Sequence, residues 1–153
     1  MHHGHRLLQQ AEPGRRGGQL PAPGPGWALE AGLDLAMSSS ACPKCHLVLV
    51  EARRATLISV AKTVDTAVAS DATVVNNSYG AQEGAYVHRL SAHYDVPGVT
   101  MVASSGDFGY GPANFPADVP AVVSAGGTAL HHAANPRGWR ENAWSGAGSG
   151  CSA

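Results

Sequence analysis

Two carboxyl residues, Glu30 and Asp34, stand four positions apart in the helix-like segment WALEAGLDLAM, residues 27–37. One helical turn separates them, so both side chains should lie on one face, close enough to share a proton. A third carboxyl, Asp107, follows an apolar segment in the glycine-flanked turn ASSGDFG, residues 103–109. A carboxyl pair with a single carboxyl at a strand end can perform acid–base chemistry. The pattern therefore indicates hydrolysis rather than passive binding.

These carboxyls could have distinct roles. Two buried neighbouring carboxyls resist double ionisation, so one pKa rises and the pair can accept a proton from a hydroxyl nucleophile. A protonated Asp107 could donate a hydrogen bond to a developing oxyanion. Each signal also has an ordinary interpretation. Glu30 and Asp34 could lie on a solvated helix face, and Asp107 could cap the backbone N–H groups of its own turn.

A third candidate segment is NNSYG, residues 76–80, which leaves a predicted strand at a glycine. Extended backbone at Ser78, Tyr79 and Gly80 could pair with a peptide as an added strand. The alternative is an ordinary turn between a strand and a helix.

Apolar periodicity predicts the elements that position these residues. The predicted helices cover residues 27–40, 55–69 and 83–93. The predicted strands cover residues 47–50, 72–77, 99–104 and 121–125, and the first two of them should be buried. Such alternation is typical of an α/β fold with a parallel sheet and helices on both faces. Functional residues in such sheets collect at the carboxyl ends of strands. Residues 1–25 show no period, and we predict an irregular, disordered segment there.

Composition narrows the function classes. The chain has 153 residues, of which 44% are hydrophobic and 14% are charged, as in a folded α/β domain. Its net charge of -1 gives no indication of binding to nucleic acid or to an anionic membrane. No apolar run reaches the roughly 20 residues that span a bilayer. No apolar signal core follows the basic residues at the N-terminus, so no export signal is visible.

The cysteines and histidines suggest structure rather than a metal site. The segment CPKCH, residues 42–46, could be half of a zinc site or a redox pair. No second cluster is spaced to complete tetrahedral coordination, so we predict a local disulfide between Cys42 and Cys45. His131 and His132 follow a predicted strand and should lie at the surface. The glycines of GAGSG, residues 146–150, lack the preceding strand and following helix of a nucleotide-binding fingerprint.

Four segments, in this order, resemble the sedolisin family of serine-carboxyl peptidases, which are relatives of subtilisin. The resemblance covers about residues 26–153, the partial catalytic domain that we expect beside the irregular segment 1–25. The matching segments are WALEAGLD (27–34), VNNSYG (75–80), ASSGDFG (103–109) and FPADVPAVVSAGGT (115–128). Four ordered matches make chance agreement improbable and favour the catalytic interpretations above.

The resemblance implies a concrete set of roles. In this family a glutamate is the general base, an aspartate one turn later orients it, and a distant serine is the nucleophile. Glu30 and Asp34 match the first two, and Asp107 matches the aspartate that stabilises the oxyanion. Ser78, Tyr79 and Gly80 match the strand that pairs with substrate. The family implies a secreted, acid-active endopeptidase that is made with a propeptide and acts on peptides or proteins.

The chain departs from the family at both ends. The nucleophile motif, Ser-Gly-Thr-Ser-x-x-x-Pro, does not occur in this sequence. The family calcium loop would lie beyond the C-terminus, so we expect no cofactor or metal in this chain. The first strand and the propeptide are also missing, so the subtilisin-like sheet should be incomplete at both ends. Cys151 would then pair with a cysteine beyond residue 153.

Three functional interpretations follow. The first is a serine-type endopeptidase domain that is cut short before its nucleophile, so that this chain alone should not hydrolyse peptides. The second is an inactive fragment or pseudoenzyme that at most binds peptides along Ser78, Tyr79 and Gly80. The third is a flavodoxin-like nucleotide or cofactor domain, which should carry a phosphate-binding loop after its first strand, and none is found.

Overall fold

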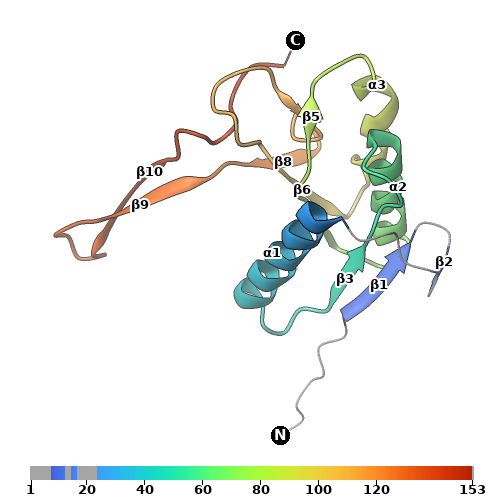
Figure 1. Cartoon of the computed structure of the whole chain (residues 1–153), viewed down its shortest axis with the longest axis horizontal. Helices are drawn as coiled ribbons and strands as arrows, with labels where there is room; N and C mark the ends of the chain where they lie inside the picture. The colour runs from blue at the N-terminus through green and yellow to red at the C-terminus, as the bar shows by residue number, and fades with distance from the viewer. Residues whose placement is uncertain (1–7, 13–14, 17–23, 153) are drawn as a thin grey trace, which may run out of the picture. The chain divides into compact units, whose positions relative to one another are not determined.

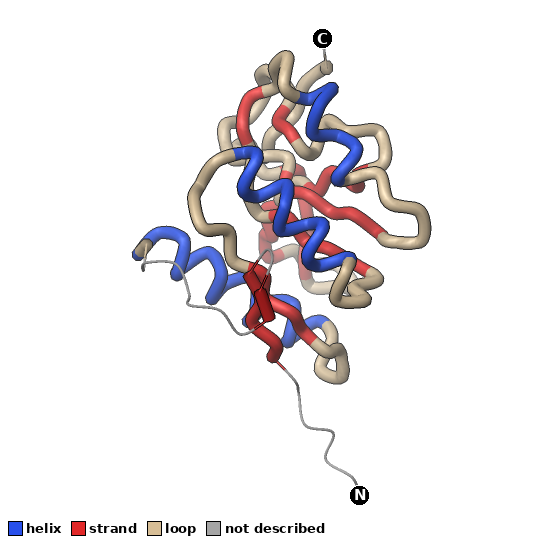
Figure 2. Tube along the Cα trace, turned by 90° about the vertical axis from the view of Figure 1, so that its right-hand side faces the viewer, coloured by secondary structure: helices blue, strands red, loops and turns tan. Residues whose placement is uncertain are grey.

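The computed structural model describes residues 8–12, 15–16 and 24–152, and the chain divides into two compact units, Met1–Val75 and Asn76–Ala153. Helices alternate with strands along the chain (Figures 1 and 2). Two of the strand pairs are parallel, β1 with β3 and β6 with β8. The predicted α/β class with parallel strands is therefore confirmed.

The first unit is a small sheet with two helices. The sheet has the order β2-β1-β3, in which β1 is parallel to β3 and antiparallel to β2. Both helices contact β3. The elements are β1 (Leu8–Glu12), β2 (Arg15–Arg16), α1 (Pro25–Ala41), β3 (Leu47–Val50) and α2 (Leu57–Val68).

Local signals set the helix ends of this unit. Pro25 stands in the first turn of α1, where its missing N–H costs nothing. The Thr56 side chain accepts a hydrogen bond from the Ser59 N–H at 3.3 Å and so caps the start of α2. One side of α2 forms the core of the unit, and its buried residues are Val60, Ala61, Thr63, Val64 and Ala67.

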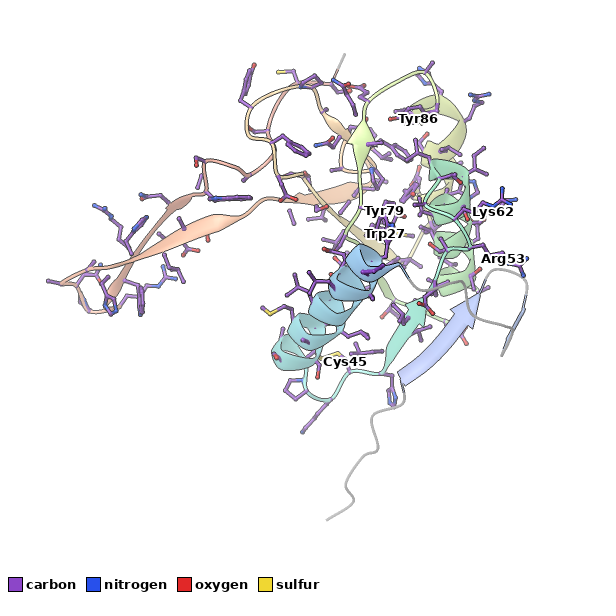
Figure 3. All side chains as sticks on the ribbon, viewed as in Figure 1. Trp27, Cys45, Arg53, Lys62, Tyr79 and Tyr86 are labelled. Atoms are coloured by element: carbon purple, nitrogen blue, oxygen red, sulfur yellow. A yellow bond between two sulfur atoms is a disulfide. The ribbon has the colours of Figure 1, made fainter. Side chains whose placement is uncertain are left out.

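The predicted disulfide between Cys42 and Cys45 is confirmed, with their Cα atoms 5.4 Å apart. Cys42 is the C-cap of α1, and its backbone N–H donates to the Ser38 carbonyl at 2.9 Å. The disulfide therefore closes the turn between α1 and β3. Cys45, one of its two residues, is labelled in Figure 3. Cys151 is exposed and forms no disulfide with a described residue, and its partner remains a prediction.

The second unit contains a parallel sheet, a short antiparallel pair and a hairpin. The sheet order is β4-β6-β8, with Met101 of β6 opposite Val122 of β8. The antiparallel pairs are β5 with β7 and β9 with β10. The elements are β4 (Val74–Asn77), which spans the unit boundary, β5 (Ala81–Gln82), α3 (Val87–Leu90), the 3-10 helix η1 (Ser91–His93), β6 (Thr100–Ser104), β7 (Asn114–Phe115), β8 (Val122–Ala125), β9 (Thr128–His132) and β10 (Trp139–Ala143).

Aromatic rings fill the core of the second unit. Tyr94 and Phe115 are fully buried, and their ring centroids lie 5.1 Å apart in an edge-to-face arrangement. Tyr86 packs edge-on against the same Phe115 ring at 5.7 Å. Edge-to-face geometry places the positive ring edge on the negative ring face, which adds to the gain from burial. Met101 and Val119 are buried in the same unit.

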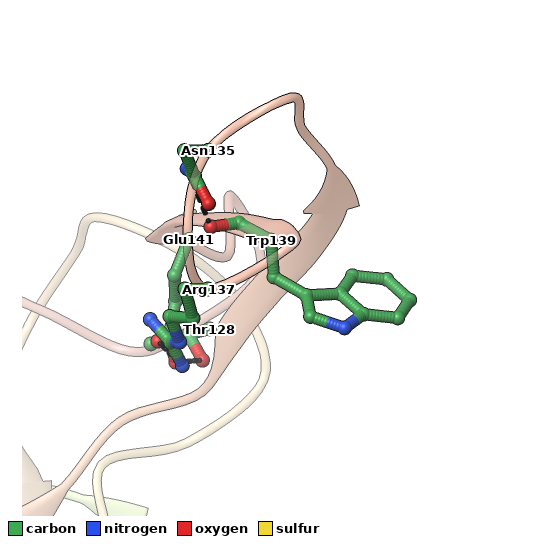
Figure 4. A network of polar contacts seen from close by, with 5 residues as sticks. All are labelled: Thr128, Asn135, Arg137, Trp139 and Glu141. Atoms are coloured by element: carbon green, nitrogen blue, oxygen red, sulfur yellow. Dashed lines mark hydrogen bonds and ion pairs between the residues drawn. The ribbon is translucent and has the colours of Figure 1, made fainter.

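The hairpin of β9 and β10 is a two-stranded ribbon whose strands are almost wholly exposed. It was not predicted from the sequence. Polar contacts near its turn hold it together (Figure 4). Glu141 accepts hydrogen bonds from Thr128 at 2.6 Å and from Arg137 at 2.9 Å, and Asn135 donates to the Trp139 carbonyl at 3.0 Å. His131 and His132 are exposed on β9, as predicted.

The prediction for residues 1–25 is wrong where the structure describes them. Leu8–Glu12 and Arg15–Arg16 form β1 and β2, and β1 supplies a strand beside β3. Backbone pairing with β3 forms this strand without any periodic pattern, because strand formation depends strongly on tertiary context. Residues 1–7, 13–14 and 17–23 lie outside the described residues.

Two other expectations need correction. The helix predicted over residues 83–93 starts only at Val87, because the Glu83 N–H donates to the Ala113 carbonyl and so extends the pairing of β5 with β7. The strand at residues 47–50 was expected to be buried on both faces, and the strand at residues 72–77 was also expected to be buried. Instead β3 is half-buried along its length, and β4 buries only Val75 and Asn77 on alternate positions.

No helix in the described part of the chain is long and apolar enough to cross a membrane.

Candidate active site

Helix α1 carries the predicted carboxyl pair on its less exposed side. Glu30 and Asp34 are half-buried and one turn apart. The apolar stripe of the same helix is more exposed, with Leu29 76%, Leu33 55% and Met37 61% accessible. A surface helix usually turns its apolar stripe inward and its charges outward. In α1 the two carboxyls instead lie on the less exposed side of the helix.

Asp107 lies in the loop that follows β6, in the second unit. It is exposed, and the glycines at positions 106 and 109 have φ angles of 107° and 70°, which side chains rarely adopt. The Ser105 N–H donates to the Ala125 carbonyl at 2.8 Å, and this bond continues the pairing of β6 with β8 into the loop. Asp107 therefore stands at the carboxyl end of a parallel strand, as predicted.

Asn114 of β7 anchors the same loop and was missed in the sequence. Its side-chain amide donates to the Ser105 carbonyl at 2.9 Å. A Cβ atom on Gly106 would overlap that amide, so the loop and Asn114 fit together only with glycine at position 106. A polar residue directly before the FPA segment was the available signal, but nothing in the spacing links it to residue 105.

Ser78, Tyr79 and Gly80 form the connection between β4 and β5. The Tyr79 hydroxyl donates to the Asn77 side chain at 2.8 Å and lies 3.0 Å from the Tyr94 hydroxyl. Burial, followed by the neighbouring Tyr94, raises the pKa of Tyr79 well above its ordinary value. The Tyr79 side chain thus faces the protein interior, which leaves the backbone of this segment as its means of pairing with a peptide.

Gly80 has a structural neighbour as well. A Cβ atom there would lie 3.4 Å from the Phe115 carbonyl oxygen and 3.7 Å from the Asn114 Cβ atom. Both are ordinary van der Waals distances, so the space at Gly80 would also admit a small side chain. That a substrate chain also binds at Gly80 remains a prediction.

The predicted site residues are carried by both units. Glu30 and Asp34 belong to Met1–Val75, whereas Asp107 and residues 78–80 belong to Asn76–Ala153. Within the first unit the two carboxyls share one helix, and within the second unit Asn114 contacts both segments. The meeting of all three carboxyls in one site stays a prediction.

A metal site is not evident in the described residues. Across residues 8–12, 15–16 and 24–152, no three His, Cys, Asp or Glu side chains gather as ligands to an ion would.

Comparison with known proteins gives the fold. The sequence matches no protein-family model and no curated protein. Among solved structures, Pseudomonas sedolisin, a serine-carboxyl proteinase complexed with pseudo-iodotyrostatin, matches with a TM-score of 0.65 and 20% identity over 88% of this chain. The prenylagaramide maturation protease PagA matches with a TM-score of 0.53 and 18% identity over 71% of this chain.

The matched chains are much longer than this one. The chain spans 48% of the sedolisin and 40% of PagA. At these identities the similarity establishes the arrangement of helices and strands. The catalytic chemistry has to be inferred from the site residues, because one fold can carry many functions. The chain therefore has the subtilisin-like fold found in Pseudomonas sedolisin.

Proposed function

We propose that this chain is part of a serine-type endopeptidase of the serine-carboxyl kind, and that it carries the base and the oxyanion carboxyl. The observation that supports this most directly is that Glu30 and Asp34 lie on the less exposed side of α1, whereas Leu29 and Leu33 are exposed. The subtilisin-like fold and the four ordered sequence segments agree with it.

The proposed chemistry assigns one task to each carboxyl. A serine hydroxyl, supplied by a part of the enzyme outside this sequence, attacks the peptide carbonyl and gives its proton to Glu30. Asp34 supports and orients Glu30. Protonated Asp107 donates a hydrogen bond to the oxyanion, and Glu30 returns its proton to the leaving amine. One removed oxyanion donor costs roughly 3 kcal/mol of transition-state stabilisation.

This division of labour fits an acidic medium. The proposed chemistry requires a protonated Asp107 while Glu30 and Asp34 together retain one negative charge. Both conditions are met only at acidic pH, because unperturbed carboxyl pKa values are about 4. We therefore propose activity at acidic pH on protein or peptide substrates, and a secreted enzyme. The backbone of Ser78, Tyr79 and Gly80 is proposed to pair with the substrate chain.

A second candidate function is peptide binding without turnover, favoured by the missing nucleophile motif. Both functions require the purified chain to bind peptide, which is tested with a fluorogenic peptide at about pH 3 to 5. We expect binding without hydrolysis from this chain alone. Hydrolysis that Glu30→Gln abolishes would show that the nucleophile lies within these residues. A chain that neither binds nor cleaves peptides would contradict both functions.

The endopeptidase proposal itself is tested on the longer protein. If the surrounding coding DNA supplies a Ser-Gly-Thr-Ser segment downstream, the joined protein should cleave peptides. Glu30→Gln and Asp107→Ala should then lower kcat by about 100-fold or more, because they remove the base and the oxyanion donor. Unchanged kcat in Glu30→Gln would exclude Glu30 as the base.

A further inference from the structure

We propose that residues 144–150, here called the glycine tail, are a positioning element for Asp107. The tail fixes the position of Asp107 by acting as a clamp, that is, by holding the backbone of residues 105–111, here called the Asp107 loop. The inference rests on the proposed role of Asp107, and both segments belong to the second unit.

Backbone hydrogen bonds join the tail to the loop along its length. Each segment donates two of them, and the tail residue Ser149 also forms a parallel bridge with Tyr110. The four bonds run from Gly109 N–H to Gly146 O (2.9 Å), from Gly111 N–H to Ser149 O (2.9 Å), from Gly148 N–H to Gly106 O (2.7 Å) and from Ser149 N–H to Gly109 O (3.1 Å). Asp107 is flanked on both sides by residues that the tail holds.

The approach is too close for side chains on the tail. A Cβ atom on Gly148 would overlap the Ser105 carbonyl, and one on Gly150 would overlap the Gly111 carbonyl oxygen. Both obstacles are backbone atoms, which cannot move aside as a flexible side chain can. A Cβ on Gly146 would meet only the ring of Trp144. Gly148 and Gly150 thus mark where the tail runs directly against the backbone of the Asp107 loop.

The opposite side of the loop is fixed by other contacts. Asn114 and the Ala125 carbonyl hold Ser105 in the bonds described above. The Asp107 side chain itself is exposed, so side-chain packing does little to fix its position. The tail and Asn114 together therefore determine where the Asp107 carboxyl stands. A hydrogen-bond donor must be held within a few tenths of an ångström to stabilise an oxyanion.

The loop offers a matched control for the test. A Cβ atom on Gly111 would meet nothing within 4 Å, and its φ angle is not in the left-handed region. Gly111→Ala in the loop and Gly148→Ala in the tail therefore each add one methyl group where the two segments meet. Only the second should separate the tail from the loop.

The test measures amide hydrogen exchange and the side-chain carboxyl 13C resonance of Asp107 in the intact chain. In Gly148→Ala we expect exchange at Gly109 and Gly111 to quicken by roughly tenfold or more, and the Asp107 resonance to move. Exchange across β6 and β8 should stay unchanged. Gly111→Ala should behave as the unaltered chain. If Gly148→Ala fails to fold, Gly146→Ala provides a milder test, because only the Trp144 ring must move.

The outcomes separate this inference from the proposed function. Unchanged exchange at Gly109 and Gly111 in both tail variants would overturn the clamp. Faster exchange with an unmoved Asp107 resonance would also overturn it, because the tail would then be merely structural. A peptide aldehyde, whose hydrate mimics the tetrahedral intermediate, is added to the unaltered chain in a separate arm. A hydrate that leaves Asp107 unperturbed would contradict the oxyanion role while the clamp stands.

Discussion

The hydroxyl oxygens of Tyr79 and Tyr94 lie 3.0 Å apart, and the Tyr79 hydroxyl also donates to the Asn77 side chain. Asn77 in turn donates to the Val102 carbonyl of β6 at 3.0 Å. A chain of polar groups thus ties the end of β4 to the neighbouring strand. Tyr94 and Asn77 are almost wholly buried, so each depends on these partners to offset its lost hydration.

Tyr79→Phe should destabilise the chain by about 1 to 3 kcal/mol, because it leaves buried polar atoms of Tyr94 and Asn77 with fewer partners. Urea unfolding followed by fluorescence measures the change. Tyr110→Phe is the control, since Tyr110 is 84% exposed and its hydroxyl should contribute less than about 0.5 kcal/mol. Equal stabilities of the two variants would contradict the structural role of the Tyr79 hydroxyl.

Tyr79→Phe also tests whether the Tyr79 hydroxyl or only the backbone of residues 78–80 binds a peptide. If only the backbone of residues 78–80 pairs with substrate, Tyr79→Phe should bind a peptide as the unaltered chain does, once both are compared well below their unfolding transitions. A large loss of affinity in folded protein would instead assign the Tyr79 hydroxyl to the ligand.

Asp118 should make the protein less stable as the pH rises. Both of its carboxyl oxygens are buried without a hydrogen-bond partner among the described residues. Burial, followed by repulsion from Glu83, raises the pKa of Asp118 above its ordinary value of 3.8. The unfolded chain therefore loses this proton more readily than the folded chain. The resulting penalty is absent below the unfolded pKa, grows as the pH rises, and is complete above the folded pKa.

Asp118→Asn should remove this penalty. We expect its melting temperature to exceed that of the unaltered chain increasingly from about pH 3 upward, until the difference levels off above the folded pKa. Asp95→Asn, an exposed aspartate of the same unit, reports the general effect of removing one negative charge. If the melting temperatures of Asp118→Asn and Asp95→Asn change with pH in the same way, the prediction is contradicted.

Much of the fold could be predicted because burial leaves a periodic signal. The apolar run at residues 47–50 gave β3 with its bounds, and the spacing of Val60, Ala61 and Val64 gave the buried side of α2. Strands formed mainly by backbone pairing leave no such signal. The glutamine-containing β1 and the exposed hairpin of β9 and β10 were therefore missed.

The catalytic roles of the carboxyls stay predictions, which rest on residue types and spacings that acid–base chemistry requires. The contacts that support the Asp107 loop were not predicted. Asn114 reaches the Ser105 carbonyl with its side-chain amide, and Gly148 approaches the same carbonyl with its backbone. Such contacts depend on the path of the chain, and a single sequence carries no record of it beyond the alternating glycines.

Leu29 illustrates where periodicity misleads. Its spacing with Leu33 and Met37 predicts a buried stripe, but Leu29 is 76% exposed in this chain. Leu29→Gln should therefore change the free energy of unfolding by less than about 0.5 kcal/mol. Val64→Ala on α2, where Val64 is 1% exposed, should cost about 2 kcal/mol. A cost for Leu29→Gln as large as that of Val64→Ala would show that this side of α1 is covered in solution.

Glu141 should titrate at a lower pH than an ordinary glutamate. The hydrogen bond from Thr128, followed by the hydrogen bond and positive charge of Arg137, lowers the pKa of Glu141. Because the folded pKa is the lower one, the stabilisation of the hairpin is present above the unfolded pKa and is lost as the pH falls through the folded pKa. The network in Figure 4 should therefore weaken at the acidic end of the proposed working range.

Two substitutions test the causes of this shift. Thr128→Ala and Arg137→Ala should each raise the titration midpoint of Glu141, because each removes a hydrogen bond to the carboxylate, and Arg137→Ala also removes a positive charge. The midpoint is measured from the side-chain carboxyl 13C resonance of Glu141. Added salt should reduce the effect of Arg137, which is exposed, and leave the short bond from Thr128 nearly unaffected. A midpoint that responds only to Arg137→Ala, and vanishes in high salt, would mean that charge alone holds the hairpin network together.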